Sequence, residues 1–260
     1  MGRRPTLTSS SLSLLDVLAI LAAGLVAGVV NAVVGTGTLL TFPTLLAVGY
    51  TPVVANMTNT VGLVLGSVSG VVGYRRELAG QGARAVELSI PTAIGAVCGA
   101  ILLLALPAGV FHRVVPLLIL FAVGLVIAQP RLSAFLARHR DHAGSWWALR
   151  AGVLLAGVYG GYFGAGVGVL FISLLSVFLK DDLQRLNAIR NVLASVANGL
   201  AAVVFIVVGH VAWLAAGLLA VSSIVGGQLG ASMGRRLPAN VLRTLIVIGG
   251  LAAVVKLLMS

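Results

Sequence analysis

The sequence predicts an all-α polytopic membrane protein. We expect about eight transmembrane helices in two homologous four-helix repeats, each with a short re-entrant or broken helix. Composition is the first observation behind this prediction: hydrophobic residues make up 59% of the chain and charged residues only 9%, whereas a soluble domain carries about 25% charged residues. The six carboxylates are too few to cover a water-facing surface. The second observation is an internal duplication.

The duplication appears as glycines, prolines and asparagines that return at a nearly constant offset. Gly95, Gly99 and Pro107 return 131 positions later as Gly226, Gly230 and Pro238. An offset of 129 relates Gly28, Gly35 and Gly37 to Gly157, Gly164 and Gly166, and an offset of 132 relates Asn59 to Asn191. Duplicated halves in a membrane protein are typical of transporters whose substrate site lies between the repeats.

Eight apolar segments have roughly the length that spans a bilayer, which is about 20 residues. In chain order they are Leu12–Val34, Asn59–Tyr74, Val86–Leu106, His112–Ala128, Trp147–Phe163, Asn187–Val208, Val211–Met233 and Val241–Met259. We interpret the first as a retained helix and not as a signal peptide, because apolar segments continue to the end of the sequence.

Two shorter apolar pieces, Thr38–Val48 and Val167–Leu179, lie at corresponding places in the two halves. At 1.5 Å per residue, the first covers only about half of a roughly 30 Å hydrocarbon core. We interpret each as one arm of a re-entrant or broken hairpin. Irregular backbone at membrane depth is tolerated only where protein or a watery cavity surrounds it, so these breaks indicate a transport site.

Residues 1–129 form the first predicted repeat, residues 130–146 a cytoplasmic linker, and residues 147–260 the second repeat. The linker includes Arg138-His139-Arg140-Asp141-His142, which we interpret as a solvated basic loop and not as a metal site. With the N-terminus inside, ten basic residues fall on the cytoplasmic side and seven outside, a weak bias in the expected direction. Four spans per half favour parallel repeats, whereas five would make the repeats inverted, and both arrangements stay open.

Two glycine clusters, Gly35-Thr36-Gly37-Thr38 and Gly164-Ala165-Gly166-Val167-Gly168, lie where a long helix stops and a short one starts. Glycine permits the unusual φ angles of a chain break. The following helix N-terminus exposes unpaired N–H groups and the positive end of its dipole, which together favour an anion. The alternative is that these glycines only allow close packing. Packing is our interpretation of the GxxxG pairs Gly24/Gly28, Gly66/Gly70, Gly95/Gly99 and Gly226/Gly230.

Amides and one arginine follow the short pieces, and such residues usually face a cavity or the bundle interior in a membrane segment. The candidate substrate-binding residues are Asn31, Gly35, Thr36, Gly37, Thr38, Asn56, Asn59, Gly164, Gly166, Gly168, Asn187, Arg190 and Asn191. Interhelical hydrogen bonding is the alternative role for the amides. Arg190 offers a planar, permanently charged fork for an oxyanion, although it could pair instead with Asp181 or Asp182. Ser195 and Asn198 lie further along the same segment.

We find no carboxylate in the middle of a span, although proton-coupled carriers usually keep one there. The run Ser67-Val68-Ser69-Gly70 is similar to an intramembrane serine protease motif but lacks its leading glycine and a histidine partner. We therefore predict that the protein is not an enzyme, with no catalytic residue, metal or cofactor.

Several of these motifs together resemble the TauE/SafE family of sulfite and organosulfonate exporters, also called toluene-sulfonate uptake permeases. The resemblance rests on Ala27-Gly28, Gly35-Thr36-Gly37, Pro43, Asn59-Thr60, Ser69-Gly70, Tyr74-Arg75-Arg76, Gly99-Ala100 and Leu106-Pro107, together with the duplication. It implies about eight spans and transport of sulfur-containing or other organic anions. Two features differ from the family pattern: threonines alternate with glycines at Thr36 and Thr38, and the helix start has Asn59-Thr60 in place of Thr-Ser.

We expect a transporter, and more specifically an exporter, of small oxyanions such as sulfite or organosulfonates, which bind mid-membrane between the repeats. An anion-selective channel, or an importer of another small organic anion, is the alternative. A membrane scaffold is disfavoured because polar residues concentrate at the repeated breaks. The expected partners are the anion and the lipid bilayer of a prokaryotic inner membrane, and not nucleic acid, because the basic residues border apolar runs. The sequence leaves open whether the protein forms a homodimer.

Overall fold

The computed structural model describes residues 12–138, 145–233 and 239–258, and all regular structure in these residues is helical. The helices are α1 (Leu14–Val33), α2 (Thr38–Val48), α3 (Pro52–Gly73), α4 (Arg75–Leu78), α5 (Gly82–Ala105), α6 (Ala108–Arg138), α7 (Trp146–Tyr162), α8 (Val167–Phe178), α9 (Leu183–Val208), α10 (Trp213–Met233) and α11 (Ala239–Leu258). Five of the described helices, α1, α5, α6, α9 and α10, are long and apolar enough to cross a membrane. The chain is therefore a multi-pass membrane protein.

Helices α1 and α2 form an antiparallel hairpin, since Gly37 at the start of α2 packs on the carbonyl of Ala27, ten residues back along α1. A capping box between Ser13 and Asp16 begins α1. Gly35, with a φ of 82°, ends the helix. The short helix α2 has the predicted bounds and ends at Gly49, whose φ of 113° is left-handed.

Helices α7 and α8 form a second antiparallel hairpin, in which Gly152 packs on Leu174 and Gly160 packs on Val167. Gly164 and Gly166, each with a φ of 76°, make its bend. The two hairpins therefore have the same order of helices: each is a long helix followed by a short one, of 11 residues in α2 and 12 residues in α8.

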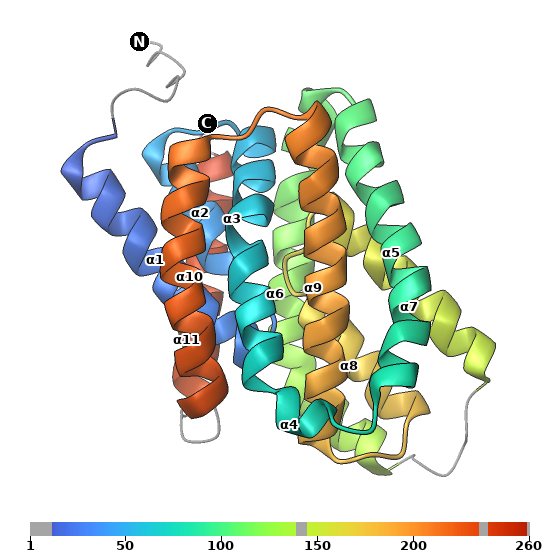
Figure 1. The fold of residues 1–260 in the computed structure, drawn as a ribbon. Helices are drawn as coiled ribbons and strands as arrows, with labels where there is room; N and C mark the ends of the chain where they lie inside the picture. The colour runs from blue at the N-terminus through green and yellow to red at the C-terminus, as the bar shows by residue number, and fades with distance from the viewer. Residues whose placement is uncertain (1–11, 139–144, 234–238, 259–260) are drawn as a thin grey trace.

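Helices α3 and α9 run antiparallel to one another through the middle of the molecule. Ser67 contacts Asn198, whereas Met57, earlier in α3, contacts Gly209, beyond the end of α9. In Figure 1, α3 descends from the end that holds the start of α1, and α9 rises toward that end. Helix α3 begins with Pro52 at its first position, so Asn59 and Thr60 lie two turns inside it. The predicted helix start at Asn59 was wrong because the sequence interpretation overlooked a proline at the first turn.

The GxxxG glycines pack the two halves of the chain against each other. An ideal Cβ on Gly95 or Gly99 of α5 would lie 2.1 or 2.0 Å from a backbone carbonyl oxygen of α7. Helix α10 contacts α1 in the same way, because a Cβ on Gly226 would lie 2.1 Å from the carbonyl oxygen of Leu25. These contacts confirm the packing role of the two pairs, and they show that the helices of residues 12–129 and 145–258 interleave.

Charges divide unequally between the two ends of the helix bundle. At the end that holds α4, Arg84 pairs with Asp181 at 3.2 Å, and Gln81 Nε2 donates to the Arg185 carbonyl at 3.2 Å. Nine basic side chains are described: six lie at this end, Arg190 lies between the ends, and two lie at the opposite end. The six are Arg75, Arg76, Arg84, Arg150, Lys180 and Arg185, and the two are Arg113 and Lys256. By the positive-inside rule, the α4 end is the one expected to face the cytoplasm.

The sequence interpretation placed the N-terminus and the linker on the same side of the membrane, and this does not fit the arrangement of the helices. The start of α1 lies at the end opposite α4, whereas the last turn of α6 and the first turn of α7, which border the linker, lie at the α4 end (Figure 1). The sequence interpretation counted both α1 and α7 as spans, and the structure describes each as the long arm of a hairpin whose short arm packs back alongside it. Residues 139–144 of the predicted linker, including His139 and His142, lie outside the described residues.

Candidate functional site

The tips of the two hairpins meet in the interior of the bundle. The N–H of Gly168 donates to the Gly35 carbonyl across 3.2 Å. An ideal Cβ on Gly35 would lie 2.6 Å from Gly168 Cα, and one on Gly168 would lie 2.5 Å from Gly35 Cα. Glycine is needed at both positions because the two backbones touch, and at Gly35 also because its φ is positive. The structure thus brings both predicted glycine clusters to one place.

Arg190 lies against this contact and is 1% exposed. Its Nη2 donates to the Ala32 carbonyl at 2.6 Å, and its Nη1 donates to the Asn31 carbonyl at 3.4 Å. Asn191 Nδ2 reaches the same Ala32 carbonyl at 3.4 Å. The last carbonyls of a helix lack intrahelical partners and carry the negative end of its dipole. The guanidinium of α9 therefore holds the C-terminal end of α1.

The alternative partners predicted for Arg190 were wrong. Asp181 binds Arg84 at 3.2 Å and Arg185 at 2.8 Å, and Asp182 caps the start of α9 through the N–H of Gln184. Both carboxylates lie at the start of α9, about two turns before Arg190. Arg190 therefore has no carboxylate partner among the described residues.

Asn56 of α3 makes the corresponding contact to the other hairpin. Its Nδ2 donates to the carbonyl of Tyr162, the last residue of α7, at 3.0 Å. Its Oδ1 is buried and accepts no hydrogen bond among the described residues. Each hairpin is thus tied to the middle helix of the other half, one by a cation and one by an amide.

The side chain of Asn59 forms hydrogen bonds with the start of α2. Its Nδ2 donates to Thr38 Oγ1 at 3.1 Å, and its Oδ1 accepts from the Thr41 hydroxyl. Thr41 also lies 3.3 Å from the Gly37 carbonyl. These bonds correspond to the interhelical role that the sequence offered as the alternative for the amides.

A half-buried polar cluster lies beside the hairpin tips, where α1, α3 and α9 meet. Ser67 Oγ accepts from Asn31 Nδ2 at 3.1 Å and from Asn198 Nδ2 at 3.3 Å. Neither Ser67 nor Asn198 was among the candidate residues. Asn198 stands 131 positions after Ser67, the offset of the duplication, and this signal could have identified the pair.

Several buried polar atoms of the hairpin tips and of α9 have no partner among the described residues. They include Thr36 Oγ1, Arg190 Nε and Ser195 Oγ. The first backbone bonds at the start of α2 are donated by Leu39 and Leu40, which leaves the N–H groups of Thr36 and Gly37 without an acceptor there. Buried polar groups are normally satisfied, so unpartnered ones indicate a missing ligand or water. Each of these groups can donate, which suits an anion, whereas the unpartnered Asn56 Oδ1 at the end of α7 can only accept.

The other candidate residues divide between the tips and positions further away. Gly164 lies near the carboxamide of Asn198, at 3.9 Å for an ideal Cβ, and Gly166 lies against Ala122 of α6. Asn187 is half-buried and makes no hydrogen bond with a described residue, so the structure does not join it to the rest. The described residues hold no group of His, Cys, Asp and Glu side chains that could bind a metal.

Comparison with known proteins gives consistent results. Residues 20–257 match the family model described as sulfite exporter TauE/SafE. The probable membrane transporter protein YfcA of Escherichia coli strain K12 is 28% identical over 236 residues, which cover 90% of this chain and 86% of that protein. A probable membrane transporter protein of Haemophilus influenzae is 29% identical and covers 90% of this chain and 91% of its own. No solved structure gives a significant match.

Proposed function

This chain belongs to the sulfite exporter TauE/SafE family of membrane transporters, and we propose that it exports a small oxyanion, such as sulfite or an organosulfonate, across a prokaryotic inner membrane. The observation that carries the proposal is the set of unpartnered donors around the hairpin tips. An anion bound there would accept from Arg190 Nε, from the Thr36 and Ser195 hydroxyls, and from the N–H groups of Thr36 and Gly37 just before α2.

The electrostatics of the interior favour a negative charge. Arg190 lies within the bundle, and the described carboxylates, Asp16, Glu77, Glu87, Asp181 and Asp182, all lie toward the ends. A buried charge without a counter-charge is costly, and a bound oxyanion would offset that cost. The planar guanidinium also matches the geometry of oxyanions. Because no acid lies at mid-depth, we expect membrane potential to drive export, which contributes about 2.3 kcal/mol per elementary charge for each 100 mV.

We further propose that the two halves are inverted repeats and that both hairpins are re-entrant. The α1–α2 hairpin enters and returns at the outer end, and α3, α5 and α6 then cross the membrane. The α7–α8 hairpin enters and returns at the cytoplasmic end, before α9, α10 and α11 cross. Three crossings per half are an odd number, so the second half has the opposite orientation. Inverted repeats around a mid-membrane site are a recurrent transporter architecture.

The tips must separate for an anion to enter or leave. Thr36 and Arg190 are each 1% exposed, and the Gly35–Gly168 contact closes the space between the hairpins. We infer that the structure corresponds to a closed state of the carrier, which opens toward one side at a time by movement at the tips.

The proposed function is tested by adding sulfite, an alkanesulfonate, sulfate, acetate and chloride to the purified protein and measuring thermal stabilisation and affinity. Sulfite or the sulfonate should stabilise the parent most. Arg190→Lys should bind it more weakly by about 1–3 kcal/mol, because an ammonium cannot replace the fork. Arg84→Lys, at the cytoplasmic surface, is the matched control. Unchanged affinity in Arg190→Lys would remove Arg190 from the site, and no stabilisation by any anion would contradict the proposal.

A flux assay in liposomes tests the driving force. We expect the anion flux to depend on the imposed voltage and to change little with a pH step at fixed voltage. Substrate protonation is controlled for by using a sulfonate, which remains ionised. Strong acceleration by the pH step would argue for proton coupling, and single-channel currents would indicate a channel in place of a carrier.

Cysteine labelling tests the inverted topology. In a Cys98→Ala background, Ser13→Cys and Ser145→Cys place one thiol before α1 and one before α7, both at exposed positions. An impermeant thiol reagent should label the first in intact cells and the second only after permeabilisation. Labelling of both thiols from the same side would contradict inverted repeats and support parallel ones.

A further inference from the structure

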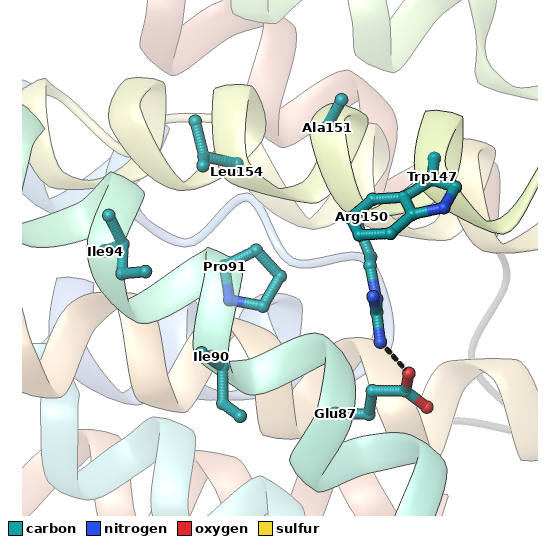
Figure 2. A pocket seen from close by; sticks show the side chains of 8 residues that line it. All are labelled: Glu87, Ile90, Pro91, Ile94, Trp147, Arg150, Ala151 and Leu154. Carbon is teal, nitrogen blue, oxygen red and sulfur yellow. Dashed lines mark hydrogen bonds and ion pairs between the residues drawn. The ribbon is translucent and has the colours of Figure 1, made fainter.

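A groove of about 450 Å³ lies between α5 and α7, near the cytoplasmic end of both helices. Its walls are apolar along most of its length, with Ile90, Pro91 and Ile94 on α5 and Ala151 and Leu154 on α7, while Glu87, Arg150 and Trp147 form one end (Figure 2). This groove is separate from the hairpin tips.

The apolar part of the groove faces outward from the bundle. Ile90 is 58% exposed and Ile94 is 54% exposed, although α5 is one of the five helices suited to crossing a membrane. Such exposure is expected for side chains that contact lipid. From Glu87 to Ile94 the groove follows two turns of α5, about 10 Å toward the middle of the membrane.

An ion pair marks the end of the groove nearest the cytoplasm. Arg150 Nη2 donates to Glu87 Oε1, and Trp146 Nε1 donates to the same oxygen at 2.8 Å. The guanidinium also lies 5.0 Å from the ring centre of Trp147. Tryptophans at this depth are typical of the membrane–water interface.

Both members of the pair keep unused hydrogen-bonding capacity. Glu87 Oε2 accepts no hydrogen bond from a described residue, and in Figure 2 this second carboxylate oxygen points away from Arg150. The Nε and Nη1 groups of Arg150 likewise donate to no described acceptor. Both side chains are accessible, with 40% of the Glu87 side chain and 31% of the Arg150 side chain exposed. A free acceptor and free donors therefore stand side by side.

From this arrangement we propose that the groove binds a zwitterionic phospholipid whose head group carries a primary amine. The phosphate would accept from the free N–H groups of Arg150, and the ammonium would donate to Glu87 Oε2, while an acyl chain fills the apolar groove. A guanidinium forms charge-assisted bonds with phosphate. A lipid with net negative charge would meet the Glu87 carboxylate, and a choline head group has no N–H to donate to it.

The test uses the full-length protein in detergent with three added lipids: phosphatidylethanolamine, phosphatidylcholine and phosphatidylglycerol with identical acyl chains. Native mass spectrometry counts the bound lipids, and thermal unfolding reports the stabilisation. We expect phosphatidylethanolamine to bind roughly tenfold more tightly than phosphatidylcholine, on the scale of one hydrogen bond to a charged group. Equal binding of the three lipids would overturn the proposal.

Two variants locate the binding. Glu87→Gln should lose the preference for phosphatidylethanolamine over phosphatidylglycerol, whereas Arg84→Gln, which breaks another ion pair at the same end, should keep it. Ala151→Phe should fill the groove from an exposed position and weaken binding of every lipid, and Leu155→Phe on the neighbouring outward face is its matched control. Undiminished lipid binding in Ala151→Phe would place the lipid elsewhere. The parent's lipid preference decides the head-group question even if a variant does not fold.

Discussion

The two hairpins have the same shape but are held differently. The end of α1 is held by the Arg190 guanidinium and the Asn191 amide, through three bonds to two carbonyls. The end of α7 is held by one hydrogen bond, from the side-chain amide of Asn56. A cation at a helix C-terminus also interacts favourably with the dipole. The first tip is therefore bound more strongly, and the second tip is the better candidate for movement during transport.

The surroundings of the bend glycines show the same difference. A Cβ on Gly35 would lie 2.3 Å from Arg190 Nη1 and 2.6 Å from Gly168 Cα. A Cβ on Gly164, the matching position of the other hairpin, would meet its nearest atom, the Gly160 carbonyl oxygen, at 2.9 Å. Both glycines have positive φ. Gly35 is thus confined by another element, and Gly164 mainly by its own helix.

The largest expected effect comes from adding a methyl group at these bends. Gly35→Ala combines the cost of a positive φ with a backbone clash and should lower the free energy of unfolding by about 2–5 kcal/mol. Gly164→Ala should cost about 1–3 kcal/mol, chiefly from its φ. Gly199→Ala, in a helix with open space around it, is the control and should be neutral or stabilising. Unfolding in detergent measures all three, and equal losses at Gly35 and Gly164 would contradict the comparison.

The next largest loss of stability is expected from replacing the side chains of Arg190 and Asn56, which hold the ends of α1 and α7. Arg190→Met leaves the Asn31 carbonyl without its donor and the Ala32 carbonyl with only the long bond from Asn191. It should cost about 2–4 kcal/mol, whereas Asn56→Leu leaves one carbonyl without its donor and should cost about 1–2 kcal/mol. Hydrogen exchange of the tip amides gives a local measurement. Exchange should rise at the end of α1 in the first variant and at the end of α7 in the second. A uniform rise in both variants would mean that the two tips open together.

The smallest effects on stability are expected from removing single threonine hydroxyls. They distinguish a hydroxyl that bonds within the protein from one that is available to a ligand. Thr41→Val removes the hydroxyl that Asn59 accepts from and should cost about 1 kcal/mol. Thr36→Val removes a buried hydroxyl with no described partner and should change stability by less than about 0.5 kcal/mol, yet weaken anion binding by roughly 1 kcal/mol. If Thr36→Val binds sulfite or a sulfonate as tightly as the parent, the Thr36 hydroxyl does not contact the anion.

Local signals in the sequence were sufficient for the helical class, the membrane setting and the two short helices. The apolar composition indicates that the protein's surroundings are lipid. The glycines before Thr38 and Val167 end one helix and begin the next, because only glycine adopts a φ near 80° at low cost. The same clusters were correctly predicted to share one place. Pairing of Asn59 with Thr38 and Thr41 could not be predicted, because it depends on the angle at which α2 packs on α3.

What the sequence determined by itself is the set of elements and the chemistry available to them: apolar helices, two glycine breaks, and one arginine in an otherwise uncharged interior. Tertiary structure decided the direction of each hairpin, the interleaving of α5 and α10 with the opposite halves, and the partner of Arg190. The reason is that hydropathy records only that a helix is buried in lipid, and not whether it crosses or returns. The groups that bind the arginine, the Asn31 and Ala32 carbonyls, belong to the backbone. Every residue carries such a carbonyl, so only the fold shows which ones lack a partner.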